Sequence, residues 1–95
     1  MTAPLPPGAC DAHMHVYDAR HPVAAPQAMQ AHATAQDYLP VRQRLGLQRA
    51  VVVQPRAHGT DHGATLDAIR QLGAEHTRGI AVLRPDVSDA ELQRL

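Results

Sequence analysis

Short apolar runs alternate with longer amphipathic segments along the 95 residues of this chain. Polar and apolar positions alternate through 9–16, which is the pattern of a β-strand. The runs at 49–54 and 79–83 are nearly continuous in apolar residues, as is typical of strands covered on both faces. An amphipathic segment follows each run, and these segments predict helices that begin near residues 37, 63 and 88.

The first helix requires a choice of starting residue. Thr34 as the N-cap leaves Pro40 inside the helix, at a cost of about 3 kcal/mol. Asp37 as the N-cap places that proline in the first turn, where its missing N–H has no partner to lose. We therefore predict a start at Asp37 and an end at Gly46. The predicted inner face consists of Tyr38, Val41 and Leu45.

The other two helices carry their own start and stop signals. Thr60 or Asp61 can cap the second helix, and Gly73 ends it. Ser88 and Glu91 form a capping box at the start of the third. The resulting β-α-β-α-β-α order predicts a parallel sheet with helices outside it.

The element order predicts the N-terminal part, about three βα units, of a (β/α)8 TIM barrel. Residues 1–8 are Pro-rich and form an extended lead-in, and 9–95 form the first units of an incomplete barrel. Two features favour this interpretation: the last helix has a start signal but no stop signal, and three strands leave both sheet edges open. A three-stranded doubly wound domain is the alternative, although no Gly-rich phosphate loop follows the first strand.

Composition excludes several classes of partner and compartment. The formal charge is zero, with nine Arg and no Lys, so neither nucleic acid nor an anionic membrane is expected as a partner. Cys10 is the single cysteine, which rules out an internal disulfide and favours a reducing compartment. The chain starts without a secretory signal pattern and has no apolar run long enough to span a membrane. We expect a cytoplasmic protein; the oligomeric state stays open.

The first predicted strand carries the strongest chemical signal. His13 and His15 are separated by one residue, so both imidazoles point to the same side of the strand, together with Asp11. Two imidazoles that converge on one point suit a divalent metal, and a nearby carboxylate can orient a ring by accepting its N–H. Two ordinary histidines at a strand end remain the alternative.

Several motifs together resemble one enzyme family. The first is Asp-Ala-His-Met-His at 11–15, which resembles the D-x-H-x-H signature of the amidohydrolase superfamily. The segments at 51–55, 58–61, 65–68 and 79–82 look like its branch of 2-pyrone-4,6-dicarboxylate hydrolase and related lactonases. The resemblance implies that His13 and His15 are catalytic and that they hold a metal, zinc or manganese, if one is bound. The superfamily also uses a later histidine and aspartate, which this chain lacks, so we expect the chain alone to be inactive.

The loop after the second strand supplies the candidate substrate-binding residues, Arg56, His58 and Thr60. For a small anionic lactone or carboxylate substrate, the arginine binds a carboxylate, and the other two donate hydrogen bonds. A solvated charge for Arg56 and a helix cap for Thr60 are the alternatives. The spacing of the remaining histidines indicates no second metal or catalytic site. His62 and His76 are interpreted as surface residues, and His21 and His32 have no evident partner. A non-catalytic metal- or anion-binding module, or a truncated remnant, is the competing account of function.

Overall fold

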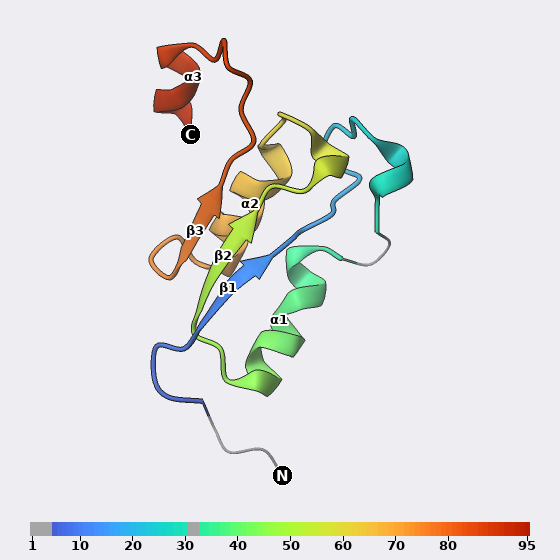
Figure 1. Cartoon of the computed structure of the whole chain (residues 1–95). Coiled ribbons are helices and arrows are strands. Elements are labelled where there is room, and N and C mark those ends of the chain that lie inside the picture. The colour runs from blue at the N-terminus through green and yellow to red at the C-terminus, as the bar shows by residue number, and fades with distance from the viewer. Residues whose placement is uncertain (1–4, 31–32) are drawn as a thin grey trace.

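A computed structural model describes residues 5–30 and 33–95. Three parallel strands lie in the order β1-β2-β3, each followed along the chain by helical structure (Figure 1). The elements are β1 (Cys10–Met14), η1 (Pro26–Ala28), α1 (Ala35–Leu45), β2 (Arg49–Val53), η2 (Arg56–His58), α2 (Gly63–Leu72), β3 (Thr77–Ile80) and α3 (Asp89–Arg94). Residues 1–4 of the predicted lead-in, and His32, lie outside the described residues.

The predicted alternation of strands and helices and the parallel sheet are confirmed. The prediction of a TIM-barrel part was wrong. The chain forms a small α/β domain whose three-stranded sheet is open, and the lack of a stop signal after α3 was not evidence for a barrel. Among the described helices, none is long and apolar enough to cross a membrane.

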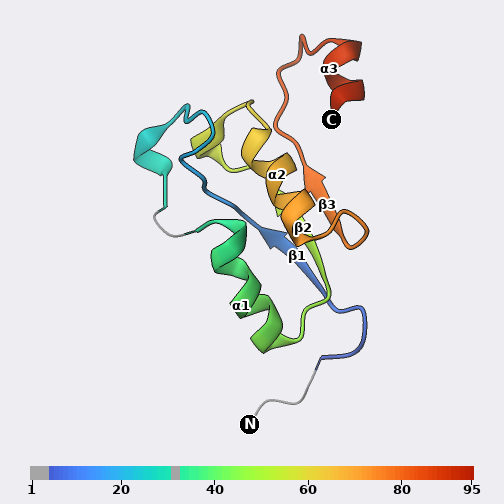
Figure 2. The same ribbon diagram turned by 180° about the vertical axis from the view of Figure 1, so that it is seen from behind.

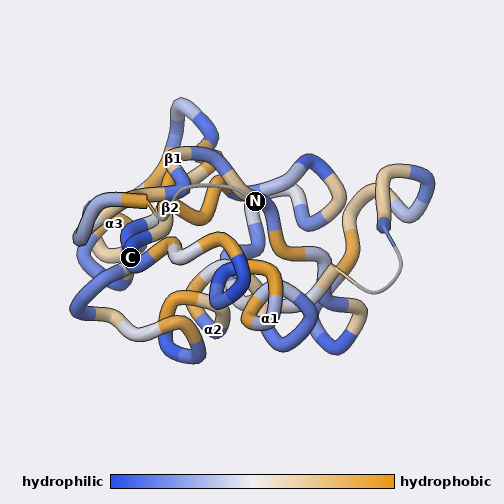
Figure 3. The backbone as a smooth tube through the Cα atoms, turned by 90° about the horizontal axis from the view of Figure 1, so that it is seen from below, coloured by the Kyte–Doolittle hydropathy of each residue, from blue (hydrophilic) through white to orange (hydrophobic). Residues whose placement is uncertain are grey.

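One face of the sheet carries the core, because α1 and α2 both lie against it (Figures 2 and 3). The buried cluster joins the sheet to α1 and α2 and consists of Met14, Val16, Ala35, Ala50, Val52, Ala68 and Leu72. Tyr38, Leu39 and Ile69 pack against this cluster.

The opposite face of the sheet is open, contrary to the prediction of strands covered on both faces. Val51 and Val53 are half-buried, and Ile80 is 52% exposed. The third strand ends at Ile80, earlier than predicted, and Val82 and Leu83 beyond it are exposed.

The start of α1 was predicted at the wrong residue. Thr34 is the N-cap: its side chain accepts from the backbone N–H of Asp37, and the Asp37 carboxylate accepts from that of Thr34. This reciprocal pair satisfies two helix-end donors, and the helix tolerates Pro40 in its interior. The predicted face was also wrong in part, because Leu45 is 53% exposed whereas Tyr38 contacts the core. Gly46 ends the helix with a φ of 73°, as predicted.

The later helix signals are confirmed in part. Gly73 is the C-cap of α2, but its N-cap is His62, while the Asp61 side chain accepts from the N–H of Gly63. The Ser88 side chain accepts from the N–H of Glu91 and begins α3, as predicted, but the Glu91 carboxylate pairs with Arg94, so only this half of the predicted capping box is present. This short helix stands at the end of the molecule, beyond β3 (Figures 1 and 2).

A bulge interrupts β1 between Asp11 and Met14. Asp11 pairs with Ala50 and Met14 with Val52, so three steps along β1 match two along β2. An extra residue of this kind breaks the alternation of side chains. Asp11 and Met14 therefore lie on the same, helix-covered side of the sheet, and Ala12 and His13 are the two residues between them in the sequence.

Candidate active site

His13 and His15 lie side by side on the open side of the sheet, near the carboxyl end of β1. Met14 and Val16, their neighbours, are buried in the core, so the two imidazoles point away from it. Their ring centroids are 5.0 Å apart with an interplanar angle of 84°, and both residues are exposed. The ring of Tyr17 follows at 6.1 Å from that of His15. The prediction that the two histidines share a face agrees with this arrangement.

The imidazole of His15 is fixed by the neighbouring strand. Its Nδ1 lies 2.9 Å from the carbonyl oxygen of Val53, the last residue of β2. A carbonyl oxygen only accepts, so Nδ1 carries the proton and donates it. In the neutral ring the lone pair is then on Nε2, which is available to a water, a substrate or a metal.

Asp11 does not lie beside these imidazoles, contrary to the prediction. The bulge turns its carboxylate towards α1, where it accepts from the hydroxyl of Tyr38 at 2.9 Å. Burial and this hydrogen bond both raise the pKa of Tyr38, so the hydroxyl stays protonated. The other Asp11 oxygen accepts from the backbone N–H of His13 at 3.3 Å. Asp11 therefore supports the backbone at the histidine pair and orients neither ring.

The loop between β2 and α2 is built around buried Gln54. Its side-chain amide donates to the carbonyl oxygens of Gly59 and Asp61, and its oxygen accepts from the hydroxyl of Thr65. One buried side chain thus binds the backbone of the 54–61 loop at two places and links it to α2.

His58, predicted to bind substrate, is instead 1% exposed. Its Nε2 accepts from the backbone N–H of Asp18 at 3.1 Å, and its Nδ1 donates to the carbonyl oxygen of Pro22 at 2.8 Å. Both ring nitrogens are thus used by the backbone of the loop after β1. The arrangement leaves neither nitrogen for a ligand.

Arg56 and Thr60, the other predicted substrate-binding residues, are exposed. Arg56 begins η2, and within residues 5–30 and 33–95 no hydrogen bond or ion pair joins it to the histidine pair. Thr60 borders a cavity of about 330 Å³ that is otherwise formed by the segment before α3 and its first turn. Among the described residues, no hydrogen bond or ion pair therefore joins either residue to His13 or His15.

His62 was predicted to be a surface residue, and it is buried. Its Nε2 accepts from the backbone N–H of Val82 at 3.1 Å, which ties the start of α2 to the segment after β3. His76 is exposed, as predicted.

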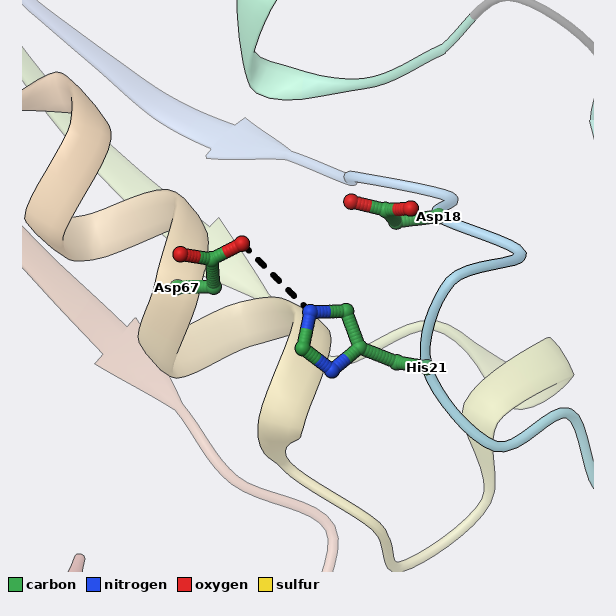
Figure 4. A group of neighbouring side chains, drawn as sticks. All are labelled: Asp18, His21 and Asp67. Atoms are coloured by element: carbon green, nitrogen blue, oxygen red, sulfur yellow. Dashed lines mark hydrogen bonds and ion pairs between the residues drawn. The ribbon is translucent and has the colours of Figure 1, made fainter.

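His21 has a partner that sequence spacing did not reveal. Its Nε2 lies 3.4 Å from a carboxylate oxygen of Asp67 on α2 (Figure 4). Asp18 completes a group whose ligand atoms lie within 4.8 Å of one another, the one such group of three among the described residues. These residue types are metal ligands, and the group is a candidate metal-binding triad.

Arginines already neutralise the two carboxylates of that triad. Arg20 donates to both oxygens of Asp18, with an ion-pair distance of 2.6 Å, and lowers the pKa of that carboxyl to about 2. Arg70 lies 3.1 Å from Asp67, and its hydrogen bond is the largest cause that lowers the pKa of Asp67. The triad thus works as an ion-pair network that fastens the loop after β1 to α2.

The predicted metal at His13 and His15 does not fit this set of residues. Catalytic zinc sites typically use three protein ligands and a water. The described residues supply only two imidazoles at this place, because Asp11 faces α1. We therefore derive no chemical step through a metal.

Comparison with known proteins identifies relatives that act on lactones. Over 94 residues the chain is 39% identical to a 2-pyrone-4,6-dicarboxylate hydrolase of Comamonas testosteroni, covering 96% of this chain and 30% of the relative. A 4-sulfomuconolactone hydrolase of Rhizobium radiobacter is 32% identical over 89 residues, or 85% of this chain and 27% of that one. A D-galactarolactone isomerase of Agrobacterium fabrum is 30% identical over 101 residues, or 99% of this chain and 34% of that one. The chain thus spans about a third of the length of these relatives.

A solved structure matches the fold as well as the sequence. A probable 2-pyrone-4,6-dicarboxylic acid hydrolase from Acinetobacter baumannii, with citric acid bound, superimposes with a TM-score of 0.79 at 29% identity. The match covers 92% of this chain and 33% of that one. No family profile matches the chain, so the predicted amidohydrolase superfamily is not supported. The homologues of this chain are lactone hydrolases and a lactone isomerase, as the predicted likeness to lactonases implied.

Proposed function

We propose that the face carrying His13 and His15 takes part in the hydrolysis of a small anionic lactone. The observation that carries this proposal is the fixed imidazole of His15, whose Nδ1 donates to Val53 and whose Nε2 faces away from the core. The lactone-acting relatives support the substrate class, since their likeness to this chain extends across β1 and β2.

The geometry supports a general-base role for His15. In the proposed reaction, Nε2 accepts a proton from a water as the water oxygen attacks the lactone carbonyl carbon. The bond between that carbon and the ring oxygen then breaks, and the imidazolium returns the proton to the departing alkoxide. The product is the open hydroxy acid. A ring that is already oriented needs little reorganisation to accept the proton.

His13 is the second functional residue of the proposal. Its ring lies edge-on to that of His15 at 5.0 Å, close enough for both to contact one small substrate. A ring N–H of His13 donates a hydrogen bond to the carbonyl oxygen, where negative charge develops during attack. Arg56, exposed on the loop after β2, is proposed to attract the substrate's carboxylate or sulfonate.

Ring opening of defined lactones by the purified 95-residue protein tests the proposal. The substrates are 2-pyrone-4,6-dicarboxylate, 4-sulfomuconolactone and D-galactarolactone, each followed with and without a metal chelator. The expectation of an inactive chain rested on the amidohydrolase resemblance, which the comparisons do not support. We therefore expect turnover above the buffer rate for an anionic lactone, without sensitivity to the chelator. Saturable binding without ring opening would instead establish a non-catalytic anion-binding module.

A further inference from the structure

We infer that His58 is a positioning residue for the His13–His15 face, an inference that rests on the proposed function. It acts by holding the backbone that leaves β1, not by touching substrate. Its imidazole is among the most completely buried large side chains, and it belongs to η2. Its two partners, Asp18 and Pro22, lie 40 and 36 residues away in the sequence.

The two hydrogen bonds require one uncharged tautomer. Pro22 offers a carbonyl oxygen, which only accepts, so Nδ1 of His58 carries a proton. Asp18 offers a backbone N–H, which only donates, so Nε2 of His58 must keep its lone pair. No other ionisation or tautomer satisfies both bonds.

The hydrogen bond between His58 and Asp18 holds the backbone three residues after His15 in the sequence. The N–H that His58 accepts belongs to Asp18, which directly follows Tyr17. The Tyr17 ring lies 6.1 Å from that of His15, and the backbone N–H of Tyr17 donates to Ala33 at 2.8 Å. Three hydrogen bonds therefore hold residues 15–18: His15 bonds to Val53 of β2, Tyr17 to Ala33, and Asp18 to His58.

Neighbouring contacts show that η2 and the loop after β1 fit each other closely. The carbonyl oxygen of Ala57, beside His58, accepts from the N–H groups of Ala24 and Ala25 at 2.8 and 3.0 Å. Gly59 has a φ of 58°, and a Cβ there would lie 2.8 Å from the Cβ of Ala24. The His58 side chain thus adds two hydrogen bonds to those that the η2 backbone makes with the loop after β1. Removing the imidazole leaves the Asp18 N–H buried without an acceptor.

Three substitutions separate the two bonds of His58. Gln places a carbonyl oxygen at about the reach of Nε2 and preserves the acceptor for Asp18. Asn places an N–H at about the reach of Nδ1 and preserves the donor to Pro22. Ala removes both. His76→Ala, at an exposed histidine in the turn before β3, is the matched control.

Ring-nitrogen NMR of the histidines and steady-state lactone hydrolysis are measured on each protein. We expect wild-type His58 to show a protonated Nδ1 and an unprotonated Nε2. We expect H58A and H58N to shift the ring signals of His15 and to lower kcat on the order of 10²-fold. H58Q should preserve both the His15 signals and kcat, and none of the variants should change KM as strongly as kcat.

A protonated Nε2 in wild-type His58, or His15 signals unchanged in both H58N and H58A, would overturn the inference. If H58A fails to fold, the comparison of H58Q with H58N decides it. If the wild-type protein opens no lactone, the proposed function fails, whereas the His15 signals still decide whether His58 positions that ring.

Discussion

The Nδ1 atom of His15 donates to the carbonyl oxygen of Val53 across 2.9 Å, so the backbone of β2 orients a side chain of the strand beside it. A backbone carbonyl is a common way to set the tautomer of a functional histidine. Here it replaces the carboxylate that the sequence pattern suggested, because Asp11 faces Tyr38. Among residues 5–30 and 33–95, the Nε2 of this exposed, oriented imidazole has no hydrogen-bond partner, and the proposed chemistry follows from that feature.

Substituting His15 with Asn should separate orientation from chemistry. The Asn side-chain amide retains a donor for Val53 but has no nitrogen lone pair in place of Nε2. We expect turnover to fall by roughly 10²-fold or more, the usual worth of a general base. The free energy of unfolding should change by less than about 0.5 kcal/mol, since the residue is exposed. Urea denaturation measures the second quantity, and a parallel loss of stability would point to a structural role instead.

The ion pair of Asp18 with Arg20 should make stability depend on acid pH. The hydrogen bond from Arg20 lowers the pKa of Asp18 from 3.8 to about 2, so the unfolded chain takes up a proton first. The contribution is therefore complete above about pH 4 and is lost as the pH falls towards 2. We expect it to be about 1–2 kcal/mol, after screening at the exposed arginine.

The Asp18→Asn variant isolates that contribution, because the amide oxygen can still accept from the backbone N–H of Arg20. The stability difference between wild type and variant, from urea denaturation at several pH values, should shrink between pH 4 and pH 2. A difference that stays constant over this range would show that the carboxylate charge is not responsible.

Thr77 carries a buried hydroxyl with no hydrogen-bond partner among residues 5–30 and 33–95. Its replacement by Val keeps the shape and removes the cost of desolvating that hydroxyl, so we expect a gain of about 1 kcal/mol in the free energy of unfolding. Thr65→Val is the control: its hydroxyl donates to Gln54, and its loss should cost about 1–2 kcal/mol. Opposite signs for the two variants in chemical denaturation would confirm the assignment; equal signs would refute it.

Pro40 lies inside α1 and deprives the carbonyl of Gln36 of an intrahelical donor. We expect Pro40→Ala to raise the free energy of unfolding by about 1–2 kcal/mol, allowing for the freer unfolded chain. Thr34→Ala should lower it by about 1 kcal/mol, because it removes the N-cap. If Pro40→Ala is destabilising instead, the helix does not extend back to Ala35.

Local patterns predicted the elements of the fold well, and their limits have physical causes. Alternation located the first strand and an apolar run the second, whereas the third run, 79–83, overlaps only the end of β3. Gly46 and Gly73 marked helix ends because they take backbone conformations that suit glycine. The start of α1 was misplaced because the cost of an interior proline outweighed the capping box in the sequence argument. In the protein, the cap at Thr34 and the burial of Ala35 against the core offset that cost.

The candidate site depends on contacts between residues far apart in the sequence, which sequence spacing cannot predict. The alternation in β1 predicted His13 and His15 together, but the bulge that turns Asp11 away exists only in the register with β2. His58 was predicted to bind substrate and His62 to lie on the surface, yet each accepts a backbone N–H from a distant segment. His21 lies 46 residues from Asp67, so no local motif could have paired them.

The central claim is that the exposed histidine pair opens a lactone ring. The most direct test compares steady-state hydrolysis of 2-pyrone-4,6-dicarboxylate by the wild-type protein, His13→Ala, His15→Ala and the control His76→Ala. Our account predicts measurable turnover in the wild type, full activity in the control and loss in both pair variants, with unchanged folding by circular dichroism. Turnover that survives in both His13→Ala and His15→Ala would contradict it.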